Sequence, residues 1–228
     1  MVQAFEWKYV IKAMPRLLHF IPITLEIWAA IIASSVLVGT LFAVIRTKHI
    51  PVLEQLVRVI ISVVRGIPPL TQLFIFYFGL PALLLKVGVD ITRIDGMWFV
   101  IMAYGLSNGA VISESLRAAF ASVGKGQEDA GYSIGMSGTK VFLRIMIPQA
   151  LVVALPSFGN LCVAALKNTS LAFAVGVIEL MTTANQFGTY SLHRMESYVA
   201  VAIVYYALYL VIRFVFNRIE NRVAYQKD

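Results

Sequence analysis

The residues that could act on a solute are few, and most of them stand inside apolar stretches. A polar side chain in lipid is costly, so it faces a partner helix, a cavity or a pathway. The candidates for a pathway through a membrane are Gln72, Asn108, Glu114, Asn160, Lys167, Asn168, Thr169 and Ser170. We therefore look first for passage of a polar solute and only then for bond-making chemistry.

The carboxylate of Glu114 would suit a positive group on a solute, such as an α-ammonium. Glu114 also stands three residues before Arg117, so the two side chains can pair on one helix face near the inner interface. We favour this pairing. Asn108 fits two interpretations equally well, because its amide can line a pathway or bind a neighbouring helix.

Lys167 has two predicted positions. If its helix starts near Pro156, Lys167 lies about 16 Å along it, near the membrane midplane. If the helix starts near Gln149, Lys167 reaches the outer interface and extends its charged end toward water. The stretch 167–170 is then either a gate in the pathway or a structural interruption of the helix.

Motifs for catalysis and for metal binding are missing from the sequence. His19, His49 and His193 are far apart and form no metal-ligand spacing, and Cys162 is the single cysteine. No glycine-rich loop ending in Lys-Ser/Thr is present, and no nucleophile elbow. We expect no catalytic residue, no metal and no cofactor bound by this chain.

Composition indicates an all-α polytopic membrane protein. The chain of 228 residues is 59% hydrophobic and only 14% charged, and a soluble globule cannot bury that much apolar surface. The net charge of +7 comes from Lys and Arg at the edges of apolar runs. This pattern is typical of loops that face the cytoplasm and anionic lipid, and it does not indicate nucleic-acid binding.

The apolar runs predict five spans in a single transmembrane domain, 1–228, with the N-terminus outside and the C-terminus inside. An amphipathic segment, 1–16, comes before them. Residues 46–65 should form a basic inner loop. The fourth apolar region should be too long and too broken for one helix, because Pro156, Gly159 and the polar stretch 167–170 interrupt it. The predicted spans are Leu17–Ile45, Pro69–Leu85, Gly96–Arg117, a span within Gln149–Ile178, and Tyr198–Phe216.

A polar stretch with several glycines, residues 126–148, stands between the third and fourth spans. A short helix opens at its start, and Gly135 fits a left-handed stop for that helix. Ser137 is a plausible N-cap for a second short helix, which Pro148 should end. The stretch therefore predicts two short helices, at an angle to each other, on the membrane surface.

The same stretch resembles the Glu-Ala-Ala loop of ATP-binding-cassette (ABC) importer permeases, in the branch for histidine, glutamine, arginine and cystine. Gly135 and Pro148 keep the family's spacing, and the family's glutamate falls on Asp129. Glu128 is one residue early, so either acid can hold the family's role. Segments 65–70 and 166–171 also resemble this branch. The resemblance assigns ATPase docking to Gln127, Glu128, Asp129, Ala130, Gly131, Gly135, Ile145 and Pro148.

The resemblance implies a type I importer permease in a prokaryotic plasma membrane. Its expected partners are a second permease subunit, two cytoplasmic ATPase subunits that bind ATP and Mg, and an external solute-binding protein. The substrate would be a polar L-amino acid, and the ATPase docked on 126–148 would drive alternating access. The rival hypothesis is an ion-coupled secondary carrier, which needs buried carboxylates and related halves. Glu114 is the strongest such carboxylate, and the sequence shows no repeat.

Overall fold

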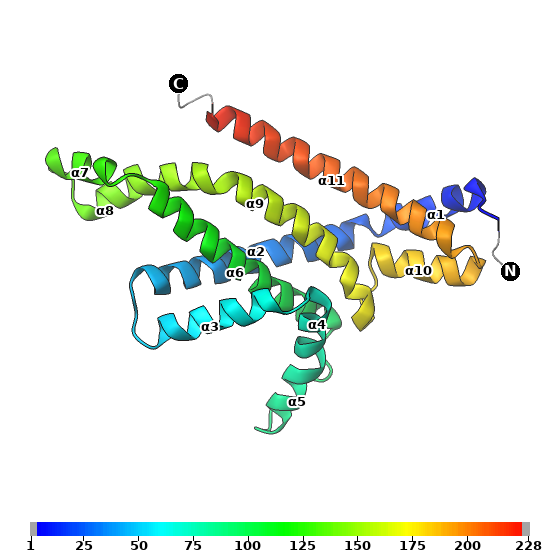
Figure 1. Cartoon of the computed structure of the whole chain (residues 1–228). Helices are drawn as coiled ribbons and strands as arrows, with labels where there is room; N and C mark the ends of the chain where they lie inside the picture. The colour runs from blue at the N-terminus through cyan, green and yellow to red at the C-terminus, as the bar shows by residue number, and fades with distance from the viewer. Residues whose placement is uncertain (1–3, 225–228) are drawn as a thin grey trace.

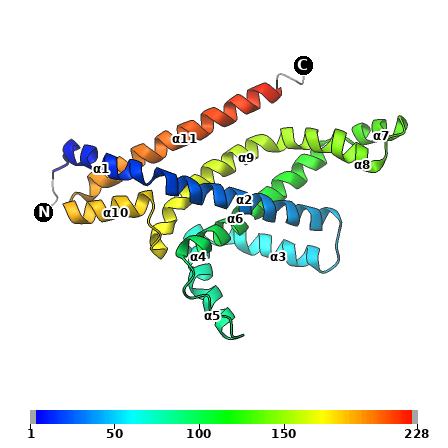
Figure 2. The same ribbon diagram turned by 180° about the vertical axis from the view of Figure 1, so that it is seen from behind.

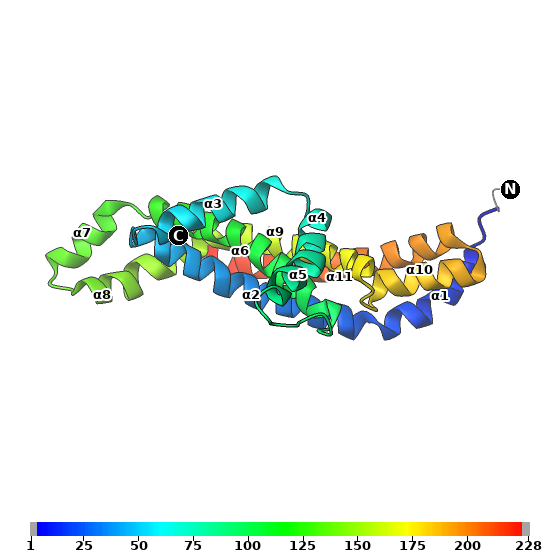
Figure 3. The same cartoon turned by 90° about the horizontal axis from the view of Figure 1, so that it is seen from below.

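A computed structural model describes residues 4–224, and every regular element in that range is helical (Figure 1). The molecule is elongated, with α7 and α8 at one end and α1 and α10 at the other. The view from behind and the view from below show the same long axis (Figures 2 and 3). The helices are α1 (Trp7–His19), α2 (Ile21–Thr47), α3 (Leu53–Gly66), α4 (Pro69–Phe74), α5 (Leu80–Leu85), α6 (Gly96–Ser122), α7 (Lys125–Ser133), α8 (Gly138–Val141), α9 (Ile147–Thr169), α10 (Leu180–Ser191) and α11 (Arg194–Ala224).

Within the described residues, four helical stretches are long and apolar enough to cross a membrane: Ile21–Thr47, Gly96–Ser122, Gly138–Val175 and Arg194–Val223. The bent pair of Leu53–Gly66 and Pro69–Leu85 makes a fifth if the two parts count as one span. The predicted all-α fold with about five spans is confirmed on this count.

Helices α2 and α6 form the most extensive helix pair in the molecule. Small residues permit the close approach: a Cβ added at Gly109 would lie 2.8 Å from the side chain of Val38. Beside this contact, Ile27, Ile31 and Tyr104 are fully buried. The tightly packed pair is therefore the support on which the other helices pack.

A bend of 119° separates α3 from the helical stretch that begins with α4. Ile67 precedes Pro68 and has extended backbone angles, as a residue before proline prefers. The amide nitrogen of Gln72 donates to the carbonyls of Val64, at 2.5 Å, and Ile67, at 2.7 Å. Those carbonyls lose their helical partners at the bend, so Gln72 stabilises it. Figure 1 shows α4 and α5 projecting sideways from the bundle.

The prediction of an inner loop at residues 46–65 is wrong from Leu53 onward, where α3 begins. Val57 and Ile61, four residues apart, are buried against the α2–α6 pair. Arg58 donates to Glu54 one turn away, at 3.0 Å from its Nε. The charges that suggested a loop therefore occupy the exposed faces of an amphipathic helix.

The fourth region is also more continuous than we predicted. A helical stretch runs from Gly138 to Val175, through a π-helical turn at Phe142–Met146 and a 3₁₀ turn at Ser170–Val175. Pro148 does not end the helix; it comes just after the π-helical turn, and a local π adjustment accommodates the N–H that proline lacks. Pro156 is accommodated within α9.

The predicted first span is likewise divided, because α1 ends at His19 and α2 begins at Ile21. Helix α1 contains most of the predicted amphipathic segment and packs on α10 and α11. Its Tyr9 ring stacks on His193, with centroids 3.4 Å apart. The backbone N–H of Glu6 donates to Glu196 at 2.9 Å. Met1, Val2 and Gln3 lie outside the described residues.

Candidate functional site

The turn between α7 and α8 has the geometry that the sequence predicts at Gly135. Gly135 has a φ of +77°, a region that residues with a Cβ rarely adopt. Its N–H donates to the carbonyl of Tyr132 at 2.9 Å, and the N–H of Met136 donates to that of Gly131 at 3.1 Å. This pair of bonds is a Schellman stop. Ser137 holds the N-cap position of α8, but its side chain forms no capping bond.

The two short helices pack tightly on each other at Gly131. A Cβ added there would lie 2.9 Å from both Ile145 Cδ1 and Val141 Cγ2. Gly131 is buried, and Val141 is only 1% exposed. The predicted site residues Gly131 and Ile145 are therefore in contact, and α7 is fixed to the stretch that leads into α9.

The hairpin of α7 and α8 makes up most of residues 126–148, which we call the coupling segment after its expected role, and it is also joined to the long helices. The Phe120 ring of α6 stacks on Phe142, with centroids 5.7 Å apart. Gln149, at the start of α9, donates to the side chain of Gln127 at 3.4 Å. A force on the coupling segment would therefore reach α6 and α9 without passing through a flexible loop.

The two acids of the coupling segment differ in their surroundings. Glu128 accepts a hydrogen bond from the Tyr132 hydroxyl at 3.2 Å, and this bond raises the pKa of Tyr132. Asp129 is exposed, and its carboxylate forms no side-chain bond within the described residues; only its backbone carbonyl accepts from Ser133. Asp129 is therefore the acid available to a partner.

Sequence reasoning missed two exposed apolar side chains on this hairpin, Ile134 at 78% and Leu143 at 55%. Phe142 is 48% exposed, and the predicted docking residue Ala130 is also exposed. Ile134 directly precedes the glycine of the turn, so it stands at the tip of the hairpin. That position was a signal that could have identified it.

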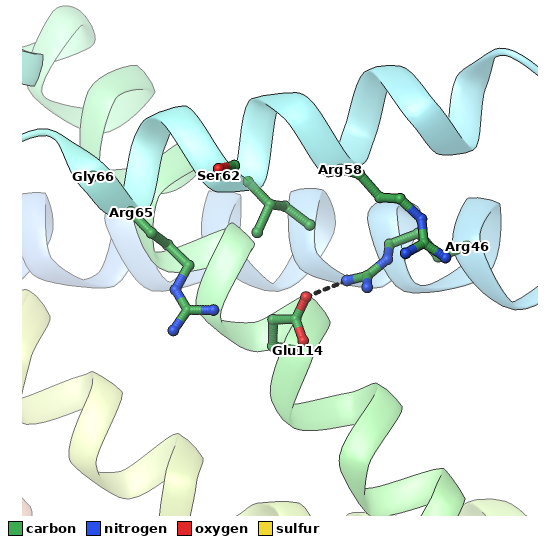
Figure 4. Close-up of a pocket in the computed structure, with 7 residues that line it drawn as sticks. Arg46, Arg58, Ser62, Arg65, Gly66 and Glu114 are labelled. Carbon is green, nitrogen blue, oxygen red and sulfur yellow. Dashed lines mark hydrogen bonds and ion pairs between the residues drawn. The ribbon is translucent and has the colours of Figure 1, made fainter.

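Glu114 lies in a basic cavity between α2, α3 and α6 (Figure 4). Its predicted partner, Arg117, donates to it at 3.3 Å, which confirms that pairing. Its second partner, Arg46 of α2, was not predictable from the sequence; Arg46 donates to the other carboxylate oxygen. Both oxygens of Glu114 are thus engaged in ion pairs.

Among the described residues, no hydrogen bond joins Gln72, Asn108 and Asn160 to one another. Gln72 is bound to the bend after α3. Asn108 is 6% exposed, and its amide nitrogen lacks a partner among the described residues. Asn160 is exposed and accepts a hydrogen bond from Arg213 of α11 at 3.2 Å.

The stretch 167–170 closes α9 at the far end from the coupling segment. Lys167 is exposed and lies 20 residues after Ile147, or about 30 Å at 1.5 Å per residue. The helix does not start near Pro156, so the argument that put Lys167 at the midplane loses its starting point. Thr169 is buried, and its hydroxyl donates to the carbonyl of Leu166 at 2.7 Å. The Ser170 hydroxyl donates to the carbonyl of Lys167, and Asn168 is half-buried.

A buried carboxylate next to this stretch escaped the sequence reasoning. Glu179 is fully buried and accepts hydrogen bonds from Tyr205, at 2.8 Å, and from the backbone of Thr182, at 2.9 Å. Burial is the largest influence on it and raises the pKa of its carboxyl group. Glu179 stands immediately before a helix, at the N-cap of α10, and an acid in that position could have been identified from the sequence.

Comparisons with known proteins identify the family of the chain. A family model described as "Binding-protein-dependent transport system inner membrane component" matches residues 35–225. The L-cystine transport system permease protein TcyL of Bacillus subtilis (strain 168) is 40% identical, over 98% of this chain and 93% of that protein. The glutamine transport system permease protein GlnP of Escherichia coli (strain K12) is 30% identical, over 96% and 98%.

A solved structure titled as an amino acid ABC transporter with histidines superposes with a TM-score of 0.84, covering 96% of this chain and 100% of its own at 24% identity. At that identity the likeness shows the fold alone, which is that of a type I importer permease. The family does not favour the ion-coupled carrier. The chain is a multi-pass membrane protein, and it belongs to the family of binding-protein-dependent transport system inner membrane components.

Proposed function

We propose that this chain is the permease subunit of an ATP-driven importer for a polar L-amino acid or a close derivative, in a prokaryotic plasma membrane. The relatives named for cystine and glutamine support the substrate class. The proposed orientation has the N-terminus outside and the coupling segment in the cytoplasm. The basic residues near the coupling segment and near the end of α11 favour that orientation.

The coupling segment is the proposed docking site for a partner ATPase that binds ATP and Mg. The observation that carries this proposal is a hairpin that is exposed at its tip and rigid at its base. Asp129 and Ile134 give a partner a charged and an apolar contact. Gly131 fixes the hairpin to the stretch that becomes α9. The remaining proposed partners are a second permease subunit and an external solute-binding protein.

The proposed mechanism needs no catalytic group in this chain. ATP-driven closure of the ATPase pair would displace the coupling segment, and α6 and α9 would move with it. Such coupling requires that the ATPase contact differs between the inward-facing and outward-facing states, since equal contact would shift no equilibrium. Substrate choice would belong largely to the solute-binding protein.

The first test compares two proline substitutions, one on each side of α7. Gly135→Pro cannot adopt a φ of +77° and loses the bond to Tyr132, so the turn must change. Gly124→Pro is the matched control, because Gly124 already has a φ of −60° and follows an extended residue. We expect Gly135→Pro to insert in membranes but to lose ATPase stimulation and transport in nanodiscs and liposomes. Gly124→Pro should keep both.

The measurement uses the chain co-purified with its ATPase and assayed with solute-binding proteins loaded with different amino acids. Stimulation by one loaded protein would support the function and identify the substrate. Normal coupling in Gly135→Pro would refute the docking proposal. A chain that purifies without an ATPase, yet moves amino acid down an ion gradient, would refute the importer itself.

The two acids of the segment give a second comparison. Asp129→Asn removes an exposed charge that no described side chain engages, whereas Glu128→Gln changes a residue already bound to Tyr132. A hydrogen bond to a charged group contributes about 1.5–3 kcal/mol, so Asp129→Asn should weaken ATPase binding by about ten-fold or more. Equal weakening by both changes would contradict the assignment of Asp129.

A further inference from the structure

The cavity around Glu114 is distinct from the coupling segment and has an excess of positive charge. Its volume is about 470 Å³, within the range of ligand pockets, and it opens to the surface. Three guanidinium groups, from Arg46, Arg58 and Arg65, line it against the single carboxylate of Glu114; Ile61, Ser62 and Gly66 complete the lining. Figure 4 shows the charged side chains that come from α2, α3 and α6, with the ion pair between Arg46 and Glu114.

The acids nearby leave part of this charge uncompensated. Glu114 is shared between Arg46 and Arg117, and Glu54 pairs with Arg58 at 2.5 Å. Arg65 forms no ion pair with any described residue. Arg46 is only 9% exposed, and its Nε has no hydrogen-bond partner within the part of the chain described here. The cavity can therefore offer free N–H groups and net positive charge to an anion.

The apolar surface beside the cavity indicates what kind of anion would reach it. On α3, Arg58, Ser62 and Arg65 share one edge, at spacings of three and four residues. The opposite edge of the exposed face of α3 carries three apolar side chains. Leu56 is 53% exposed, Val59 is 59% exposed and Val63 is 51% exposed. Between this apolar edge and the basic edge lie only the uncharged residues Gln55 and Gly66, so the basic cavity borders an apolar surface.

We propose that this cavity binds the phosphate of an anionic phospholipid headgroup from the cytoplasmic leaflet, with an acyl chain lying on the Val59 and Val63 edge. Arginine forks fit phosphate oxygens well, and basic pockets between spans on the cytoplasmic side suit anionic headgroups. Arg46 lies one residue before the end of α2, near the predicted inner interface. The inference rests on the proposed orientation, which puts this end of α2 at the cytoplasmic side.

The test measures lipid binding to the full chain, purified with its partner subunits, by native mass spectrometry. Phosphatidylglycerol and phosphatidylcholine with the same acyl chains are titrated in parallel. We expect tighter binding of phosphatidylglycerol. Each of Arg58→Gln and Arg65→Gln should weaken it about 5-fold, and the double change about 25-fold, because an arginine near the surface contributes about 1 kcal/mol to such binding.

Arg222→Gln is the matched control, since Arg222 is exposed on α11 and does not line the cavity. It should leave the affinity unchanged. Arg58 and Arg65 are exposed, so their variants should fold, which thermal unfolding in zwitterionic detergent can verify. A further arm adds inorganic phosphate and glycerol 3-phosphate at millimolar concentration, which should not displace the lipid.

Equal binding of the two lipids would overturn the proposal. So would an equal loss in Arg222→Gln, which would indicate only general attraction of charge. Displacement of the lipid by soluble phosphate would assign the cavity to a small anion instead. The readout does not involve ATP, so failed ATPase coupling together with intact lipid selectivity would refute the proposed function alone.

Discussion

The ion pair between Arg46 and Glu114 should respond very differently to the loss of its two members. Arg46 is 9% exposed, its Nε has no partner among the described residues, and Glu114 accepts from its Nη1. Glu114 is 27% exposed and keeps Arg117 at 3.3 Å as a second partner. Removing Glu114 therefore leaves a buried charge unpaired, whereas removing Arg46 does not.

The cost of each substitution in free energy of unfolding follows from this asymmetry. An unpaired buried charge typically costs about 3–5 kcal/mol, and the partial exposure of Glu114 favours the lower end for Glu114→Gln. Arg46→Met leaves Glu114 in a pair of the surface type and should cost about 1 kcal/mol. The double variant should then unfold at a smaller cost than Glu114→Gln alone, because the unpaired guanidinium is gone.

The assay is a double-mutant cycle, with the free energy of unfolding measured by denaturant titration in mixed micelles. Ser62→Ala is a control, because Ser62 lines the same cavity, and no hydrogen bond of its side chain is recorded among the described residues. Glu114→Gln and Arg46→Met should differ by about 2 kcal/mol. Equal costs that simply add in the double variant would refute the argument that Arg46 depends on Glu114.

Three further changes test other parts of the structure. At Gly131 even an added Cβ would lie 2.9 Å from Ile145, so Gly131→Val should destabilise by about 1–3 kcal/mol in thermal unfolding. An added Cβ at Gly126 would meet no atom within 4 Å, so Gly126→Val should cost much less. Similar losses would contradict tight packing in the coupling segment. Gln72→Leu leaves two carbonyls at the bend without their donor, so it should lower the free energy of unfolding by about 1–3 kcal/mol. It should also widen the distribution of distances between spin labels on α3 and α5. An unchanged distribution would show that the prolines alone hold the bend. The raised pKa of Glu179 means that the folded state binds this proton more tightly than the unfolded state, so wild-type stability should fall as pH rises from the ordinary value of 4.5 toward the raised pKa. Glu179→Gln should lack that part of the decline in melting temperature, and identical pH profiles would contradict the assignment.

The coupling segment was predictable because its determinants are local. A glycine that must adopt a positive φ, a short helix before it and a second helix after it all lie within a few residues. The apolar runs likewise predicted the number and order of the spans. Pro148 was misread because a π-helical turn just before it accommodates the missing N–H, and the helical stretch continues through the proline.

The basic cavity was not predictable, because its parts are distant in the sequence. Arg46 and Glu114 are 68 residues apart, and only the packing of α2 on α6 brings them together. The charges of segment 46–65 also concealed α3, although Val57 and Ile61 already had the spacing of a buried helix face. Charge composition indicates which side of the membrane a segment faces, but it does not indicate whether the segment is helical.

Helix α6 connects the two regions that matter most for the proposed mechanism. Glu114 lies eight residues before the end of α6 at Ser122, or about 12 Å along a helix that continues almost directly into α7. A displacement of the coupling segment is therefore a displacement of one wall of the basic cavity. If the cavity has different shapes in the inward-facing and outward-facing states, a lipid bound there would favour one of them, and ATP binding would change the lipid affinity by the same factor. The lipid and the ATPase would then act on one equilibrium through a single helix.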